Sequence, residues 1–157
     1  MDGGKRSEGF TLVEVLVSVL ILGIGLLGMA GLQNAGIAAG YSALHRSQAS
    51  WLAGEMADLL RANPDAARAG AYDTGFAEVA GGCPKAAGST RAQLDLGQWL
   101  ASVCETLGGT GSGSVKVSRS GELFSALISV RWSDRRARDR LEASGDGRET
   151  FVYRAGL

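Results

Sequence analysis

The sequence contains few of the residues from which catalytic and metal sites are built. It has one histidine, His45, and two cysteines, Cys83 and Cys104, among 157 residues. A catalytic zinc site needs about three protein ligands, commonly including histidine, and a structural zinc site needs about four. No Ser/His/Asp or Cys/His set for nucleophilic catalysis can be assembled around a single His45. We therefore expect no catalytic residues, no metal and no cofactor.

An excess of charge of one sign is also missing. Lys and Arg together number 16, as do Asp and Glu, so the formal net charge is zero. This balance gives no support for a general nucleic-acid binder, which is usually strongly basic. One local exception is a basic stretch with two aspartates, whose arginines are Arg131, Arg135, Arg136, Arg138 and Arg140. These arginines could hold phosphates while Trp132 stacks on a base, but we prefer a solvated loop between strands.

Charge is absent altogether from Val15 to His45. Within and just before this region, residues 10–32 are nearly all apolar or small. As a helix they would span roughly 34 Å, enough to cross a hydrocarbon core of about 30 Å. Lys5 and Arg6 precede the run, and the first basic residue after it is Arg46. The positive-inside bias therefore predicts a cytoplasmic N-terminus, with the rest of the chain across the membrane.

Three interpretations of this segment are possible. A secretory signal peptide could be cut near Ala38 and Gly40, but its apolar region would usually span only about 7–15 residues. A plain single-pass anchor fits the length but gives Glu14 no role, although an acid at a helix centre costs about 2.5–3.5 kcal/mol on insertion scales. The third interpretation, which we prefer, uses the short basic leader, the sequence Gly-Phe-Thr-Leu-Val-Glu at residues 9–14 and the apolar run together.

This order of features resembles the class III signal of type IV prepilins and pseudopilins. The resemblance implies that prepilin peptidase cuts between Gly9 and Phe10 and methylates the new amine of Phe10. It also implies that Glu14, then the fifth residue, faces the Phe10 amine of a neighbouring subunit and sets its register. Opposite charges in a low-dielectric bundle attract strongly, and an unpaired charge is penalised.

A helical pattern continues beyond the apolar run as far as Asn63-Pro64. The residue before proline avoids the helical region, so we expect one helix from Phe10 to about Ala62, roughly 80 Å long. Its second half should pack on a soluble domain through apolar residues at three- and four-residue steps, namely Leu44, Trp51, Leu52, Met56, Leu59 and Leu60. Residues 9–64 are also similar to the type IV pilus minor pilin family PilV.

The remaining sequence predicts a small α+β domain. Residues 65–90 have the composition of a loop, and a second helix is expected over residues 94–107, with its apolar face formed by Leu96, Trp99, Leu100, Val103 and Leu107. Alternating stretches at residues 114–120, 123–133 and 149–155 predict an antiparallel sheet. With the long helix packed on this sheet, the expected fold is pilin-like.

Cys83 and Cys104 lie in the part expected to face the periplasm. That compartment is oxidising, so a disulfide between them is predicted, with two free thiols as the alternative. Cys-x-x-Cys spacing is absent, which argues against a redox pair. A disulfide would tie the loop region to the second helix and stabilise the fold by roughly 3 kcal/mol.

Together these features predict a minor pilin that helps to initiate or cap type IV pilus assembly. The expected parts are a leader (1–9), a membrane part of the first helix (10–32), its amphipathic continuation (33–63) and a periplasmic domain (64–157). The expected partners are prepilin peptidase, other minor pilins and the major pilin through the N-terminal helix, and inner-membrane lipid before assembly. The final location would be the pilus. The alternative is a minor pseudopilin of a type II secretion system.

Overall fold

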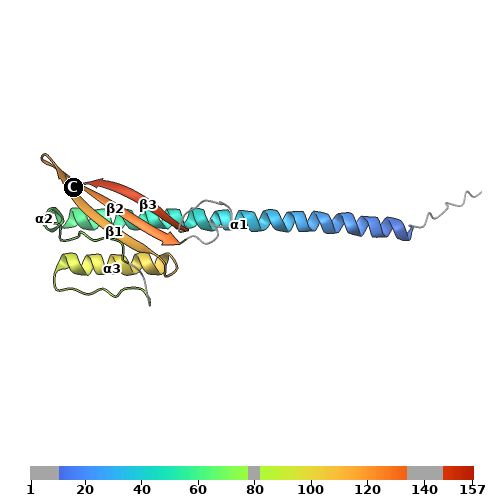
Figure 1. Ribbon diagram of the computed structural model, residues 1–157, viewed down its shortest axis with the longest axis horizontal. Helices are drawn as coiled ribbons and strands as arrows, with labels where there is room; N and C mark the ends of the chain where they lie inside the picture. The colour runs from blue at the N-terminus through green and yellow to red at the C-terminus, as the bar shows by residue number, and fades with distance from the viewer. Residues whose placement is uncertain (1–10, 78–81, 134–146) are drawn as a thin grey trace, which may run out of the picture. The chain divides into compact units, whose positions relative to one another are not determined.

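Three helices and three strands form the chain in the computed structural model, which describes residues 11–77, 82–133 and 147–157. In chain order they are α1 (Leu12–Ala62), α2 (Pro64–Arg68), α3 (Arg91–Thr106), β1 (Ser112–Ser120), β2 (Leu123–Ser133) and β3 (Arg148–Gly156) (Figure 1). The chain divides into two units, Met1–Gly40 and Tyr41–Leu157. A long N-terminal helix, a small antiparallel sheet and a shorter helix confirm the predicted α+β pilin-like fold.

The helix α1 is continuous over 51 residues and ends where the sequence predicts, just before Asn63-Pro64. The prediction of a loop from residue 65 was wrong at its start. Pro64 is the first residue of the five-residue helix α2. The N–H groups in the first turn of a helix have no partner within that helix, so a proline, which has no N–H, loses no hydrogen bond there. The same proline therefore stops one helix and starts the next.

The three strands form one sheet in the order β1-β2-β3, with both neighbouring pairs antiparallel. Ser120 pairs with Leu123, which leaves Gly121 and Glu122 as a two-residue hairpin loop. Gly121 has a φ of 63°, a value that glycine adopts without strain and that tight hairpin loops require. At the other edge of β1, Thr74 makes a bridge to Val115.

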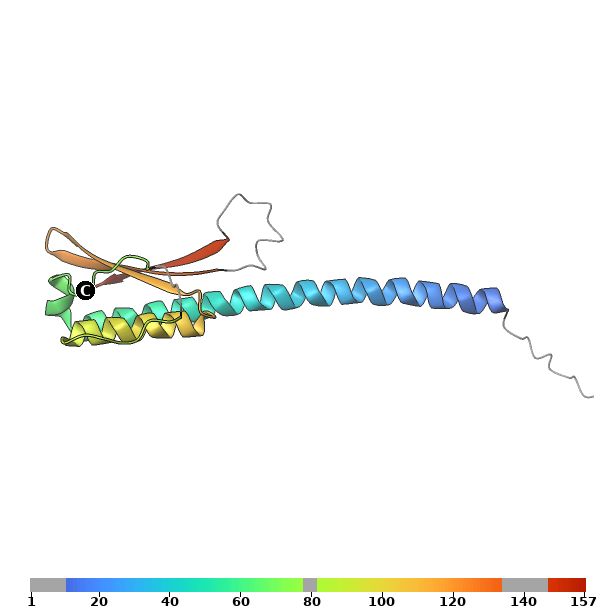
Figure 2. The same ribbon diagram turned by 60° about the horizontal axis from the view of Figure 1, so that its bottom comes forward.

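The core of the second unit lies between the sheet and two helices. Figure 2 shows the second half of α1 and α3 side by side across one face of the sheet. From β2, alternate residues point into this core, while α1 contributes residues at three- and four-residue steps. These residues are Ala126, Ile128, Val130 and Trp132 from β2, and Ala49, Leu52, Ala53, Met56, Ala57 and Leu60 from α1.

Two residues of the predicted apolar stripe on α1 lie outside this core. Trp51 is 78% exposed and Leu44 is 49% exposed. Successive residues of a helix are about 100° apart around its axis, so a side chain next to Leu52 in sequence faces a different direction. The buried face of α1 combines three alanines with three larger residues, Leu52, Met56 and Leu60.

The second predicted helix begins three residues earlier than expected, at Arg91. Thr90 and Gln93 form a capping box, in which the side chain of each residue accepts the backbone N–H of the other. Its predicted apolar face is confirmed, since Trp99, Val103 and Leu107 are buried and Leu96 and Leu100 pack against the core. The indole N–H of Trp99 donates to the carbonyl of Leu52 at 2.8 Å, which joins α3 to α1.

The structure also joins Cys83 to Cys104 in a disulfide, with the two Cα atoms 5.5 Å apart. Cys104 lies in α3 and is fully buried, whereas Cys83 lies in the segment that leads to α3. The bond thus fastens that segment to the helix. It would persist in an oxidising compartment and be lost in a reducing one.

A buried polar network lies at the C-terminal end of α1. The Tyr72 hydroxyl donates to a carboxylate oxygen of Asp95 at 3.0 Å, and the Asn63 amide donates to the Tyr72 hydroxyl at 3.3 Å. Arg91 pairs with the same Asp95 at 2.8 Å. Burial raises the pKa of the Tyr72 phenol above its ordinary value, and the Asp95 charge raises it further.

This network predicts a specific loss of stability in alkali. Because the pKa of Tyr72 is raised in the folded protein, the folded state holds the phenolic proton more tightly than the unfolded state. The stabilisation is complete below the unfolded pKa of about 10 and is lost as pH rises through the folded pKa. Urea unfolding from pH 8 to 11.5 should show wild type losing stability relative to Tyr72→Phe only above about pH 10. A difference that stays constant over this range would contradict the prediction.

Close packing of β1 on α3 predicts a second stability effect. A Cβ at Gly113 would overlap the six-membered ring of Trp99, whereas a Cβ at Gly156 of β3 would meet nothing within 4 Å. Gly113→Ala should therefore lower the free energy of unfolding by about 1–3 kcal/mol, as overpacking does in other cores. Gly156→Ala is the matched control for a glycine in a strand. Equal stability of both variants in chemical unfolding would refute this packing argument.

Candidate functional site

The first turn of α1 is organised by Thr11. The Thr11 hydroxyl accepts the backbone N–H of Glu14 at 3.2 Å. The Thr11 carbonyl accepts the N–H groups of Glu14 and Val15 at 3.1 and 3.3 Å. Thr11 is therefore the N-cap of the helix, and Glu14 is its third residue. The spacing Thr-x-x-Glu is that of a capping box, a sequence signal that predicts this helix start and that our sequence analysis overlooked.

Glu14 lies exposed in this first turn, at the positive end of the helix dipole, where a negative charge is stabilised. No Lys or Arg follows it in the sequence before Arg46. In the part of the chain that the structure describes, no cationic side chain pairs with the Glu14 carboxylate. The Ser18 hydroxyl donates to the Glu14 backbone carbonyl at 2.7 Å, and this bond does not involve the carboxylate. Among the described residues, the Glu14 carboxylate therefore has no cationic partner.

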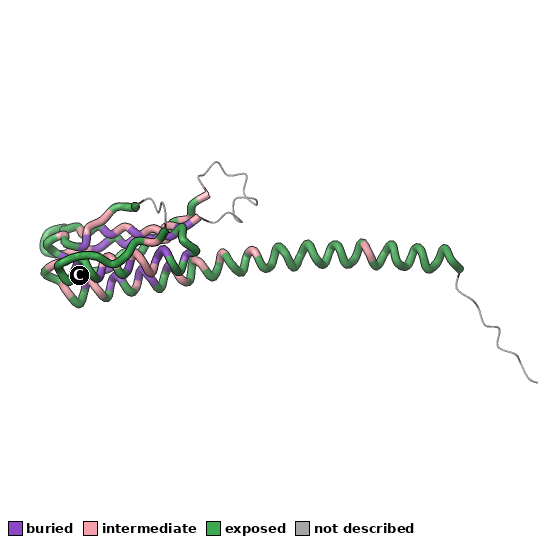
Figure 3. The backbone as a smooth tube through the Cα atoms, turned by 90° about the horizontal axis from the view of Figure 1, so that it is seen from below, coloured by how far each residue is buried: buried purple, intermediate pink, exposed green. Residues whose placement is uncertain are grey.

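A long apolar surface follows Glu14. Every large apolar side chain of α1 from Leu12 to Ile37 is exposed, and most are more than half exposed. Figure 3 shows this part of the helix almost wholly in the exposed colour. The helix is long and apolar enough to cross a membrane, and its most apolar window has a mean hydropathy of 2.5. Exposed apolar surfaces of this size are typically covered by lipid or by other proteins.

The predicted cleavage junction, Gly9 and Phe10, lies outside the described residues. The same holds for Arg135, Arg136, Arg138 and Arg140 of the predicted basic patch.

The remaining arginine of that patch, Arg131, lies in β2. Its guanidinium stacks 3.6 Å from the centre of the Phe76 ring, and its Nε atom is buried without a hydrogen-bond partner. Arg131 is therefore engaged within the domain.

The arrangement at the start of α1 can be compared with known proteins. Residues 4–30 match the family model of the prokaryotic N-terminal methylation motif. The match includes the Gly9-Phe10 junction, the Thr11 cap and Glu14, and it extends into the exposed apolar part of α1. No curated protein and no solved structure matches the chain.

The motif supports a type IV pilin-like protein that is a substrate of prepilin peptidase. The motif suggests a structural protein rather than an enzyme. Together with the exposed apolar helix, the motif fits anchoring in the inner membrane before assembly.

The capping geometry predicts how the helix start responds to substitution. Thr11→Ala removes the side-chain acceptor for the Glu14 N–H and leaves only the Thr11 carbonyl. Loss of an N-cap side chain typically costs about 0.5–2 kcal/mol. Amide hydrogen exchange at Glu14 and Val15, measured by NMR on the full chain in detergent micelles, should therefore become faster. Thr11→Ser retains the hydroxyl and should exchange like wild type. Unchanged exchange in Thr11→Ala would show that the cap does not hold the first turn.

Proposed function

We propose that this chain is a minor pilin of a type IV pilus system. It would be inserted in the inner membrane, cut by prepilin peptidase between Gly9 and Phe10, and methylated on the Phe10 amine. It would then join other minor pilins, and the major pilin, to initiate or cap the filament. The observation that carries the proposal is a Glu14 carboxylate that has no cationic partner among the described residues and lies in the first turn of an exposed apolar helix, inside a prepilin-type motif.

The proposed step depends on charge pairing at low dielectric. Cleavage would place a cationic amine on Phe10, directly before the Thr11 cap. Glu14 lies one helical turn further along, and a neighbouring helix shifted along the axis would bring its own amine beside this carboxylate. Attraction between the charges is strong where water is excluded, and either charge alone is costly there. A subunit inserted out of register would leave both charges unpaired, so the pair selects the correct register.

The second unit fits a role outside the cytoplasm. Its disulfide between Cys83 and Cys104 is of the kind that persists in an oxidising compartment such as the periplasm. Its core is built on the second half of α1, so the domain is joined to the helix by packing as well as by the chain. A filament subunit needs this connection, because force applied to the helix must reach the domain.

A minor pseudopilin of a type II secretion system is the alternative, since both systems use the same signal. The similarity of residues 9–64 to the minor pilin family PilV favours the pilus. Deletion of the gene separates the two: loss of surface pili with normal protein secretion supports a pilin, and the reverse supports a pseudopilin.

The role of Glu14 is tested by Glu14→Ala. The variant should insert into the membrane at the wild-type level, because removing an acid from an apolar segment makes insertion easier. Its recovery in sheared filaments should fall by about tenfold or more, as expected when a buried charge loses its partner. Quantitative immunoblots of membrane and filament fractions give both values. Glu105→Ala, at an exposed acid on α3, is the control. Wild-type recovery of Glu14→Ala in filaments would refute the proposed register.

A further inference from the structure

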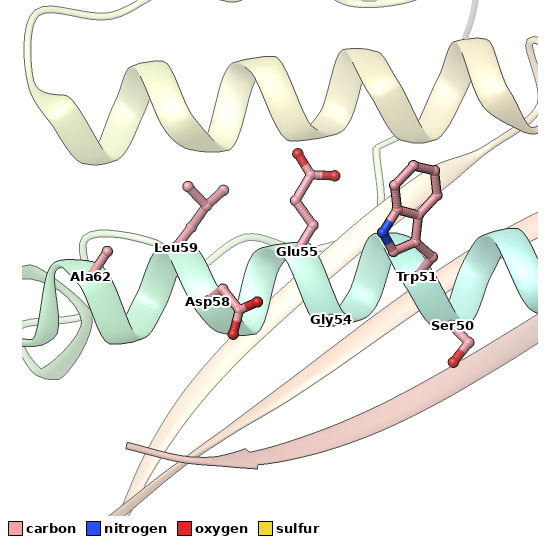
Figure 4. Close-up of a pocket in the computed structure, with 7 residues that line it drawn as sticks. All are labelled: Ser50, Trp51, Gly54, Glu55, Asp58, Leu59 and Ala62. Carbon is pink, nitrogen blue, oxygen red and sulfur yellow. The ribbon is translucent and has the colours of Figure 1, made fainter.

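The second unit carries a surface groove that its fold does not use. The groove has a volume of about 600 Å³ and lies along three turns of α1 (Figure 4). Its lining residues all belong to this helix and are Ser50, Trp51, Gly54, Glu55, Asp58, Leu59 and Ala62. None of these lining residues is among the buried residues of α1.

One end of the groove exposes an unusually large apolar side chain. Trp51 is 78% exposed, whereas the other two tryptophans, Trp99 and Trp132, are each only 1% exposed. Leu59 lies two turns further along the same side of α1 and is partly buried against the core. An exposed tryptophan on an ordered helix is a typical anchor of a protein interface.

The floor of the groove is a glycine that the fold of this chain does not require. A Cβ added at Gly54 would meet nothing within 4 Å. Glycine in a helix interior is unfavourable relative to alanine, and no close contact among the described residues explains it here. Its missing side chain opens the space between Trp51 and Asp58. Small residues in helices allow another helix to approach closely, as Gly54 would here.

The groove is also acidic. Glu55 and Asp58 are its charged lining residues, and neither is balanced by a cation in the lining. Asp58 pairs with Arg61 at 3.0 Å, but this pair is largely exposed and lies within one turn of the helix, so it is weak. Charged groups at an interface select a partner of opposite charge. The partner should therefore be basic.

We propose that this groove binds a helix of a neighbouring pilin-type subunit that carries lysine or arginine. This inference rests on the proposed function and names a partner surface for the second unit. The partner helix places small or aliphatic side chains over Gly54, between Trp51 and Leu59. Its basic side chain lies beside Glu55 and Asp58, within reach of the Trp51 ring, which attracts cations through its face. The linear form of the groove suits such a rod-like element.

Photo-cross-linking in cells that assemble filaments tests this contact on the full chain. The photoreactive residue p-benzoylphenylalanine replaces Trp51, and in a control it replaces Gln98 on the exposed side of α3. Mass spectrometry should map the product from position 51 to a Lys- or Arg-bearing helix of another protein with the methylation motif, and position 98 should not give that product. A product only with a second copy of this chain, only with lipid, or none at all would overturn the proposal.

Substitutions in the groove provide an independent test in the same cells. Gly54→Leu fills the floor, and Glu55→Lys with Asp58→Lys reverses its charge. Each should lower recovery in the filament fraction at least about fivefold, which corresponds to a modest loss of interface free energy. Gln98→Leu and Glu105→Lys are the matched controls and should behave as wild type. Wild-type recovery of both groove variants would overturn the proposal.

Folding and processing are measured in the same variants. Gly54→Ala adds a Cβ in open space, so its thermal midpoint should not fall below that of wild type, and Gly54→Leu is compared with it. Cleavage after Gly9 should be normal in every groove variant. Normal cleavage and wild-type filament recovery would remove the groove as a contact and leave the minor pilin proposal intact. A wild-type chain that is never cleaved would instead overturn the proposed function itself.

Discussion

The apolar surface along the first half of α1 is the constraint on which the rest of the molecule depends. From Leu12 to Ile37 its large side chains are exposed, and they form too wide a surface to remain in water. Lipid can cover this surface, and so can apolar helices of other subunits. Both environments have a low dielectric, so the electrostatic interactions of a carboxylate at the start of the helix are stronger there than in water. A carboxylate such as that of Glu14 is tolerable near a membrane interface, and in the proposed bundle of apolar helices it would need a cationic partner.

The same helix changes its packing in its second half. There, buried alanines at four-residue steps alternate with the larger residues Leu52, Met56 and Leu60, and all of them lie in the core. The Trp99 hydrogen bond, the Tyr72–Asp95 contact and the disulfide hold α3 and its preceding segment to this arrangement. A chain built in this way can pass a load from the helix into the domain. It also leaves one side of α1, around Gly54, open for another molecule.

Much of this fold could be predicted from periodicity alone. The strands and the apolar face of α3 follow from residue spacing, because each spacing fits one type of element. The end of α1 follows from Pro64, because the residue before a proline avoids the helical region. The exposure of Trp51 could not be predicted. The predicted apolar stripe included two residues that are exposed, Leu44 and Trp51, and residue spacing does not distinguish them from the buried members of the stripe. Which side of α1 is buried is decided by packing in the folded domain, where Ala49, Ala53 and Ala57 lie in the core together with Leu52, Met56 and Leu60. The start of α3 depends on the Thr90–Gln93 cap, a local polar signal that apolar periodicity does not register.

The methylation motif was visible in the sequence because its residue types are unusual in that order. The Thr11 cap could have been found from the Thr-x-x-Glu spacing, whereas the groove could not, since it depends on a missing side chain at Gly54.

The measurement that tests the central claim most directly is the intact mass and N-terminal peptide of the chain, purified from cells with and without prepilin peptidase. The account predicts a chain that begins with N-methylated Phe10 when the peptidase is present, and an uncut chain when it is absent. A chain that begins at Met1 in both would indicate a plain membrane anchor, and one that begins near Tyr41 an exported domain. Either result would contradict the account, because Glu14 would then have no neighbouring amine to meet.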